Sequence, residues 1–208
     1  TTGQELTIRD VHASAHAVAH SPNGQFVATG GLEGVKLWDA KTHELVHRWT
    51  MPGDVQSIGF TSGGERVAAA SSKTRMTVWK VADGRELHSL PLAGDIGGLA
   101  LSADGVQAVS SVHQTGRLDI WNLVSGANHL LRAGSDDALA RGLVLHPSRN
   151  LIAAGMNVTI ELWDLDRKEL MATLRGHDEL IEALAFNGDG SRLFSGDAGG
   201  VIKVWNWE

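Results

Sequence analysis

Tryptophan recurs at a nearly constant interval along this chain of 208 residues. Five tryptophans, each at or near the end of a short run of β-branched and apolar residues, are separated by 41, 42, 42 and 42 residues: Trp38, Trp79, Trp121, Trp163 and Trp205. A fixed period of this length is typical of an array in which one supersecondary unit is repeated. The sequence therefore predicts a single domain over residues 1–208, built from five repeats that end near these tryptophans.

Each repeat can be divided into four short strands separated by turns. In the last repeat an apolar stretch, residues 180–186, ends at a turn over residues 187–190, which is rich in glycine and aspartate. Such residues adopt the backbone conformations of tight turns. A second strand at 192–195 and a third at 201–205 follow, and the β-branched and aromatic residues of the third favour a strand. The segment after each tryptophan, such as residues 168–174, supplies the fourth strand.

The second strand of each repeat consists mostly of small and apolar residues with little polar alternation. This pattern occurs at residues 26–29, 66–70, 106–109 and 151–154. It is typical of a strand that is covered on both faces. Radial stacking of small antiparallel sheets gives such coverage, because each sheet lies between two neighbours. The predicted fold class is therefore all-β, a β-propeller of four-stranded antiparallel blades.

The repeats resemble the WD-repeat β-propeller family over the whole chain. The resemblance rests on Trp38-Asp39, Trp163-Asp164, the turn over residues 21–24, and Gly176-His177, whose histidine lies 28 residues before Trp205. It implies that Ser195 and Trp205 belong to a hydrogen-bond network of Ser, His, Asp and Trp. It also implies a likeness to bacterial members, in which such propellers are joined to kinase, nucleotidase or cytochrome modules.

The repeats depart from the family pattern at the aspartate and histidine of this network. The position of the aspartate is occupied by Gly199 in the last repeat, by Glu33 at the nearest place in the first, and in the others by Lys73, Thr115 and Asn157. His177 has no evident counterpart in the other repeats. We therefore expect degenerate repeats, held together mainly by apolar packing and not by a repeated polar network.

The two ends of the chain predict how the array closes. Residues 1–6 read as a segment that follows a tryptophan, and the chain ends three residues after Trp205, so the period continues across the ends. The resemblance implies a five-bladed ring closed by pairing of residues 5–8 beside residues 201–205, which would hide an exposed sheet edge. The alternatives are an open array, a partial ring completed by another chain, or part of a larger propeller. We expect one domain of a longer protein, monomeric if the ring closes and self-associating otherwise.

Composition excludes several classes of partner. The formal net charge is −6, and no run of Lys or Arg occurs, so the sequence predicts no nucleic-acid or anionic-membrane surface. No apolar stretch approaches the ~20 residues of a membrane span. The absence of cysteine excludes disulfides and thiolate chemistry and is compatible with a reducing compartment such as the cytoplasm.

The ten histidines invite a metal hypothesis, above all His12, His16 and His20. Their spacing would align them on a helix. The repeat frame instead places His20 at the end of an innermost strand and His12 in the loop before that strand, so we do not expect them to converge. The sequence predicts no metal site and no cofactor.

Acidic residues occur in the connection that leads into the first strand of every repeat. They are Asp10, Asp54, Asp95, Asp136, Asp137, Asp178 and Glu179. Charges of one sign around an opening focus the electric field, so these residues are a candidate ligand-binding mouth for a basic peptide of another protein. Two alternatives are that the aspartates only accept backbone hydrogen bonds in turns, or that they bind calcium, which needs six to eight oxygens close together.

Three classes of function are compatible with this pattern. The first is a non-catalytic module for protein–protein interaction or scaffolding, because a rigid scaffold with many short loops presents several binding surfaces. The second is a structural or engineered array without a ligand. The third is an enzyme with a site at one mouth, for which the candidate pairs are Ser14 with His12 and Asp178 with His177. Because neither pair has an evident third orienting group, we predict no catalytic residues.

Overall fold

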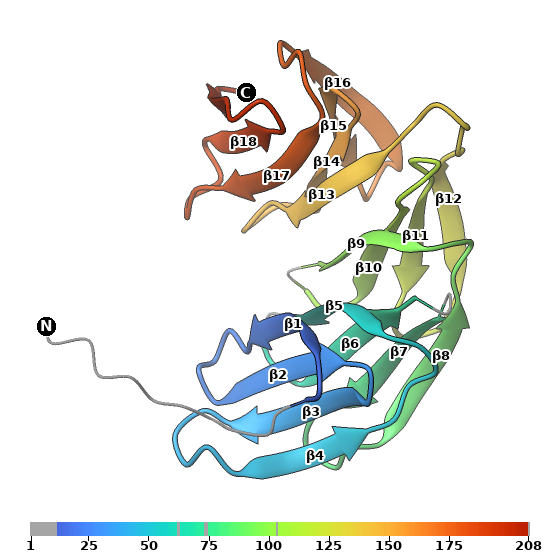
Figure 1. Cartoon of the computed structure of the whole chain (residues 1–208), viewed down its shortest axis with the longest axis vertical. Coiled ribbons are helices and arrows are strands. Elements are labelled where there is room, and N and C mark those ends of the chain that lie inside the picture. Colours follow the sequence, from blue (N-terminus) through green and yellow to red (C-terminus); the bar gives the residue numbers. More distant parts are fainter. Residues whose placement is uncertain (1–11, 62, 73–74, 103, 208) are drawn as a thin grey trace, which may run out of the picture.

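The strands form five antiparallel sheets, which we call blades one to five (Figure 1). The computed structural model describes residues 12–61, 63–72, 75–102 and 104–207. Blade one contains β1 (Ala15–His20), β2 (Phe26–Gly31), β3 (Gly34–Asp39) and β4 (Leu45–Trp49). Blade two contains β5 (Val55–Phe60), β6 (Arg66–Ser71), β7 (Arg75–Lys80) and β8 (Glu86–Pro91). Blade three contains β9 (Ile96–Leu101), β10 (Gln107–Val112), β11 (Leu118–Asn122) and β12 (Asn128–Arg132). Blade four contains β13 (Ala140–Leu145), β14 (Leu151–Met156), β15 (Thr159–Asp164) and β16 (Glu169–Arg175). Blade five contains β17 (Ile181–Phe186), β18 (Leu193–Asp197) and β19 (Ile202–Trp205).

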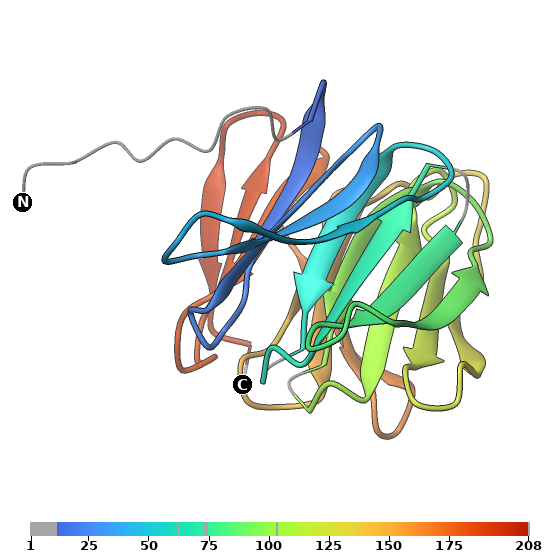
Figure 2. The ribbon, with the colours of Figure 1, turned by 90° about the horizontal axis from the view of Figure 1, so that it is seen from below.

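The blades stand side by side in an arc. The first strands β1, β5, β9, β13 and β17 lie on its inner side, and the last strands β4, β8, β12 and β16 lie on its outer side (Figure 1). The view from below shows the sheets stacked against one another (Figure 2). The predicted four-stranded antiparallel blades are confirmed for blades one to four, whereas blade five has three strands in the described residues. Within the described residues, no helix is long and apolar enough to cross a membrane.

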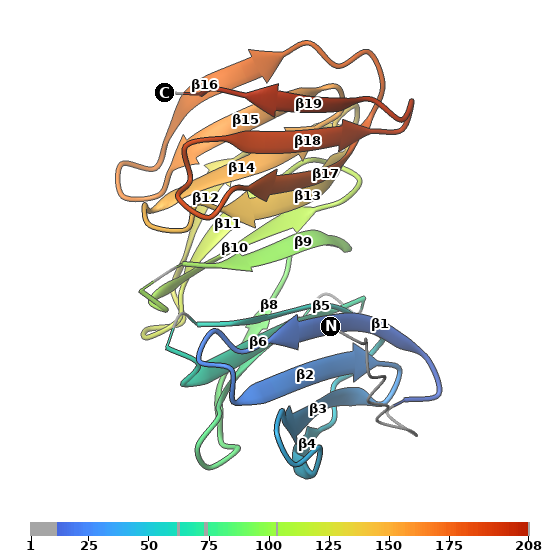
Figure 3. The same cartoon turned by 90° about the vertical axis from the view of Figure 1, so that its left-hand side faces the viewer.

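Closure into a five-bladed ring is not confirmed. Successive first strands pack against each other from β1 to β5, β9, β13 and β17, but no comparable packing joins β17 to β1 among the described residues. The two end blades therefore face an opening in the arc (Figures 1 and 3). The predicted closing strand, residues 5–8, lies outside the described residues.

The hydrophobic core is divided into four clusters, one between each pair of adjacent blades. In the first cluster, Ala28 and Leu37 of blade one pack with Val67 and Trp79 of blade two. Residues that alternate along a strand point to opposite sides of the sheet, so each blade contributes one row of side chains to each neighbouring cluster. Three of the periodic tryptophans, Trp79, Trp121 and Trp163, are buried in these clusters between blades.

Two tryptophans outside the period also contribute. Trp49 of β4 stacks on Trp79 with ring centroids 5.0 Å apart and donates from Nε1 to the Gly84 carbonyl at 2.7 Å. The second is Trp207. The repeat pattern does not predict that it is buried, but it is half-buried. Its Nε1 donates to the Gly190 carbonyl at 3.0 Å, and its ring lies edge-on to His146. Each occurs in one repeat only, so periodicity could not identify these contacts.

Replacing Trp79 by Ala should destabilise the protein by about 3–5 kcal/mol, because it leaves a cavity between blades one and two and removes the Trp49 stack. The urea midpoint of unfolding measures this cost. Met171→Ala, in the exposed part of β16, is the control and should leave the midpoint nearly unchanged. Equal effects of the two substitutions would contradict the packing role of the periodic tryptophans.

Candidate ligand-binding end of the propeller

The loops that carry the predicted acidic residues lie at one end of the blades. In blades two to five, the turn between the second and third strands donates a backbone hydrogen bond to the loop that leads into the first strand. The pairs are Ser72 to Asp54, His113 to Asp95, Asn157 to Leu139 and Ala198 to Leu180, with N···O distances of 2.8, 2.9, 3.0 and 2.8 Å. Asp54 and Asp95 thus occupy equivalent positions, whereas blades four and five have leucine there.

Asp54 is engaged within the protein. Its Oδ2 forms an ion pair with Nδ1 of His16 and accepts a hydrogen bond from Nε2 of Gln56 at 3.1 Å. Its backbone N–H donates to the Ser72 hydroxyl at 3.0 Å. Nε2 of His16 is also 2.6 Å from the Ser14 hydroxyl. Asp54 therefore links blades one and two and is a poor candidate for an open acidic mouth.

Asp95 and Asp136 line one open pocket with a volume of about 490 Å³ at the end of blade three. Both residues are exposed, and within the described part of the chain their carboxylates have no hydrogen bond or ion pair. Arg117 also lines the pocket, but its guanidinium holds the buried Asp119 at 2.7 and 2.8 Å, an interaction that raises the pKa of Arg117. The pocket thus keeps two unpaired carboxylates beside a guanidinium that is already paired.

The remaining predicted acids are not gathered into this pocket. Asp137 is exposed, and its carbonyl accepts a hydrogen bond from Nδ2 of Asn157 at 2.8 Å. Asp178 and Glu179 are exposed at blade five, next to the buried His177. Asp10 lies outside the described residues. The structure therefore brings together only two of the predicted site residues.

Blade five contains the complete polar network, with a different aspartate from the predicted position. Nδ1 of His177 is 2.6 Å from Oδ2 of Asp197, and Nε2 is 2.6 Å from the Ser195 hydroxyl, which accepts a hydrogen bond from Nε1 of Trp205 at 2.8 Å. Asp197, two residues before Gly199, takes the role expected at position 199. Hydrogen bonds from the Val201 backbone and from His177 lower the pKa of Asp197.

Parts of this network recur in other blades, so the expectation that His177 has no counterpart is wrong. The tryptophan Nε1 donates to Thr29 in blade one and to Ser110 in blade three, at 3.0 and 2.8 Å. His12 bonds the Thr29 hydroxyl at 3.1 Å and is the counterpart of His177; burial lowers its pKa. The sequence signal is a hydroxyl residue nine to eleven residues before the periodic tryptophan.

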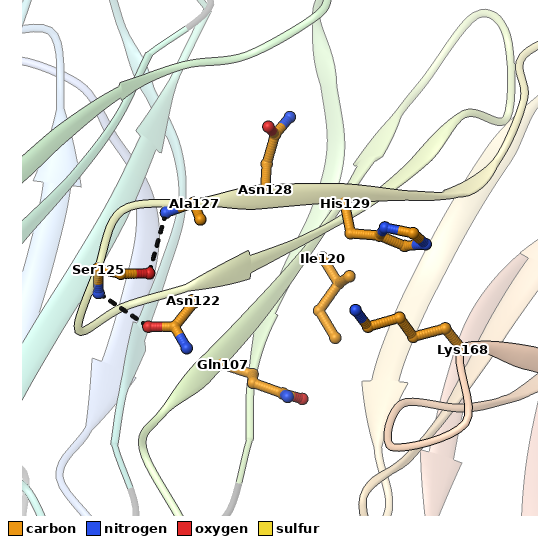
Figure 4. Close-up of a pocket in the computed structure, with 8 residues that line it drawn as sticks. All are labelled: Gln107, Ile120, Asn122, Ser125, Ala127, Asn128, His129 and Lys168. Atoms are coloured by element: carbon orange, nitrogen blue, oxygen red, sulfur yellow. Dashed lines mark hydrogen bonds between the residues drawn. The ribbon is translucent and has the colours of Figure 1, made fainter.

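A second pocket, which the sequence did not indicate, lies on the outer side between blades three and four. It has a volume of about 290 Å³ (Figure 4). Lys168 extends from the blade-four turn toward Ile120, near the His129 ring. Asn122 and Ser125 are occupied in holding the turn, since Asn122 accepts the Ser125 backbone N–H at 2.8 Å and Ser125 accepts that of Ala127 at 3.3 Å. This pocket contains none of the predicted acidic residues.

Replacing Ser195 by Ala should cost about 1–3 kcal/mol of stability, because it leaves Nε2 of His177 and Nε1 of Trp205 buried without their shared partner. Chemical denaturation checks the loss. Ser148→Ala, in an exposed turn, is the matched control and should have little effect. If Ser195→Ala is as stable as its control, the network does not hold blade five together.

Two segments, residues 3–39 and 168–206, match the family model "WD domain, G-beta repeat". The chain is 23% identical over 189 residues to autophagy-related protein 16 of Arabidopsis thaliana, covering 88% of this chain and 36% of that protein. It is 28% identical over 177 residues to "Cell division cycle 20.1, cofactor of APC complex" of the same plant, covering 83% of this chain and 29% of that protein. The chain thus spans about a third of these relatives.

The fold is also that of a solved propeller. The β-propeller domain of Cps50 (Swd1) from Myceliophteria thermophila superposes with a TM-score of 0.85 at 16% identity, covering 96% of this chain and 67% of that domain. Both of the plant relatives are eukaryotic proteins, so the likeness to bacterial members is not supported. Two segments of the chain are thus similar to the WD-repeat model, and the architecture of the blades is that of a β-propeller.

Proposed function

We propose that this chain is a non-catalytic interaction module that binds a basic segment of another protein at the end of blade three. The observation that carries the proposal is the pocket lined by Asp95 and Asp136, whose carboxylates have no partner within the described residues. Two unpaired carboxylates beside one pocket are suited to a Lys or Arg side chain, since ion pairs between such groups form without the cost of breaking an existing pair.

The rest of the pocket fits a peptide ligand. Gln114, Thr115 and Ser135 line the same pocket and offer amide and hydroxyl groups that can hydrogen-bond to a peptide backbone. The chain carries a formal net charge of −6, which attracts a basic segment over a longer range than the pocket itself. Because Asp54 is held by His16, the proposed site is one pocket and not a ring of acids around the channel.

The relatives support an interaction role in general. WD-repeat propellers commonly bind other proteins, and the second plant relative is named a cofactor of a complex. That name describes the relative alone, of which this chain matches 29%. The proposed partner is therefore defined by its chemistry, a segment rich in Lys and Arg.

The double variant Asp95→Asn, Asp136→Asn should bind Lys- and Arg-rich peptides roughly two- to thirty-fold more weakly than the unmodified chain. It removes two exposed ion pairs, and each such pair contributes about 0.2–1 kcal/mol to binding. Fluorescence anisotropy with a labelled peptide measures the change. Raising the salt concentration should weaken binding to the unmodified chain, because the Debye length falls to ~10 Å at 0.1 M.

The charge-matched control is Asp178→Asn, Glu179→Gln at blade five, which removes two exposed acids away from the pocket. It should retain peptide binding. Equal weakening by both double variants would mean that net charge, and not the pocket, attracts the peptide. Binding that is independent of salt and kept by the pocket variant would contradict the proposed site.

A second candidate function, acyl transfer, rests on Ser14, His16 and Asp54. The Ser14 hydroxyl is 2.6 Å from Nε2 of His16, and Nδ1 of His16 is paired with Asp54. This is the order of nucleophile, base and orienting acid that activates serine in hydrolases. The sequence indicates a pair of Ser14 with His12 and no third group, whereas the structure supplies His16 and Asp54.

The chemistry of such a site would be simple. The Ser14 oxygen would attack an ester carbonyl carbon while its proton moves to Nε2 of His16; the alcohol then leaves with that proton, and water hydrolyses the acyl–serine. Catalysis also needs hydrogen-bond donors at the developing oxyanion, and we assign none among the described residues. Acyl transfer therefore ranks below peptide binding.

A fluorophosphonate probe tests this second candidate, because an activated serine displaces its fluoride. If the candidate is correct, mass spectrometry should find the label on Ser14, and His16→Gln should abolish it by removing the base. Ser195, which contacts the histidine of a similar histidine–aspartate pair, His177 with Asp197, but is buried, is an internal control and should remain unlabelled. An unlabelled Ser14, or labelling that His16→Gln leaves unchanged, would exclude the acyl-transfer function.

A further inference from the structure

Each blade has two apolar faces, one toward the next blade along the chain (its leading face) and one toward the preceding blade (its trailing face). In blade two, Ala68, Met76 and Val78 form the leading face and are fully buried in the cluster with blade three. The pairs Ala68–Val78 and Ala70–Met76 define their register in the sheet. This register permits a residue-by-residue comparison with the other blades.

The equivalent residues of blade five are exposed. Phe194 pairs with Val204 and Gly196 with Ile202, one and three residues before the periodic Trp205. The exposed fractions of Phe194, Ile202 and Val204 are 36%, 75% and 52%. An isolated exposed hydrophobic residue needs no explanation, but a contiguous apolar sheet face is typical of an interaction surface.

The trailing face of blade one is also uncovered among the described residues, and it carries the side chain that would fit against the face of blade five. At each interface between blades, the first strand of the following blade inserts one aliphatic side chain at the same register; these residues are Ile58, Leu99, Leu143 and Leu184. Val18 occupies this register in blade one, opposite Thr29, and is 72% exposed. Figure 3 shows the two end blades on either side of the opening.

The shape of the blade-five face fits such a side chain. In the first interface, a Cβ atom on Gly30 would collide with Val55 and would lie only 2.7 Å from Cδ1 of Ile58, so the missing side chain makes room for both residues. Gly196 is the equivalent glycine of blade five, and a Cβ atom there would meet nothing within 4 Å. Gly196, Phe194 and Ile202 line a shallow hollow of about 220 Å³. The receiving surface is present and unfilled.

The similar propeller domain points to the kind of occupant. This chain superposes on 67% of that domain, and no comparable packing joins β17 to β1 among the described residues, so the described blades form an open arc. In a propeller a blade face is covered by another blade. Among the described residues, the trailing face left uncovered is that of blade one.

We propose that the leading face of blade five binds the trailing face of blade one in a second copy of the chain, with Val18 of one copy against Gly196 and Ile202 of the other. The two faces differ, so the contact is head-to-tail and leaves a free face at each end of the pair. Such contacts add further copies as concentration rises, unless a ring closes. This surface is separate from the acidic pocket of blade three.

Analytical ultracentrifugation of the 208-residue chain tests the proposal. The unmodified chain should form dimers and larger species of the 22.1 kDa unit as concentration rises. Val18→Glu and Ile202→Glu should each be monomeric alone, because each blocks one face. Their equimolar mixture should form dimers and nothing larger, since each variant keeps the face that the other lacks.

Met171→Glu, on the outer strand β16 with 52% exposure, is the control and should associate like the unmodified chain. Both face variants alter exposed side chains, so circular dichroism and thermal unfolding should show an intact fold. A chain that is monomeric at every concentration overturns the proposal, as does a mixture of the two variants that stays monomeric. Dimers of Val18→Glu alone would show that two blade-five faces bind each other, which also overturns the head-to-tail contact.

Discussion

Apolar packing between adjacent sheets is the interaction on which the rest of this structure depends. A three- or four-stranded sheet cannot bury both of its faces by itself, so each blade is stabilised by its neighbours. Small residues in the second strands, such as Ala68 and Ala69, let the sheets approach closely, while Trp79 and its periodic equivalents fill the space between them. The same dependence explains why Val18 at one end of the arc, and Phe194, Ile202 and Val204 at the other, are left exposed.

The polar network is secondary to this packing, and its members differ from blade to blade. The hydrogen bond from tryptophan to a hydroxyl occurs in blades one, three and five, while Trp163 donates instead to Glu161 at 3.0 Å. Only blade five adds both the histidine and the aspartate among the described residues. Because each bond joins groups that the packing already places together, a blade can lose one partner and still fold. Repeats can therefore become degenerate in polar residues while they keep their apolar rows.

The fold could be predicted from the sequence because periodicity is a property of the whole chain, and one irregular repeat does not erase it. The candidate site could be predicted only in part. Asp54 and Asp95 share a position, yet His16 from the neighbouring blade pairs with Asp54 while Asp95 stays open. Such a difference depends on a side chain about 40 residues away in sequence. The aspartate at an unexpected position has a different cause: Asp197, two residues before Gly199, is the last residue of β18 and reaches His177 from the strand itself.

The two proposed surfaces use opposite physical forces, which allows them to be studied in one sample. The acidic pocket lies among the loops at one end of the blades, whereas the docking faces are the sheet surfaces that border the opening of the arc. Salt screens the attraction between exposed charges, while strongly excluded salts such as sulfate strengthen the burial of apolar surface. Added sulfate should therefore weaken peptide binding and favour association of the chain. Because the surfaces do not overlap, an assembled array would present one acidic pocket per copy, and a partner with several basic segments would bind it more tightly than it binds a single chain.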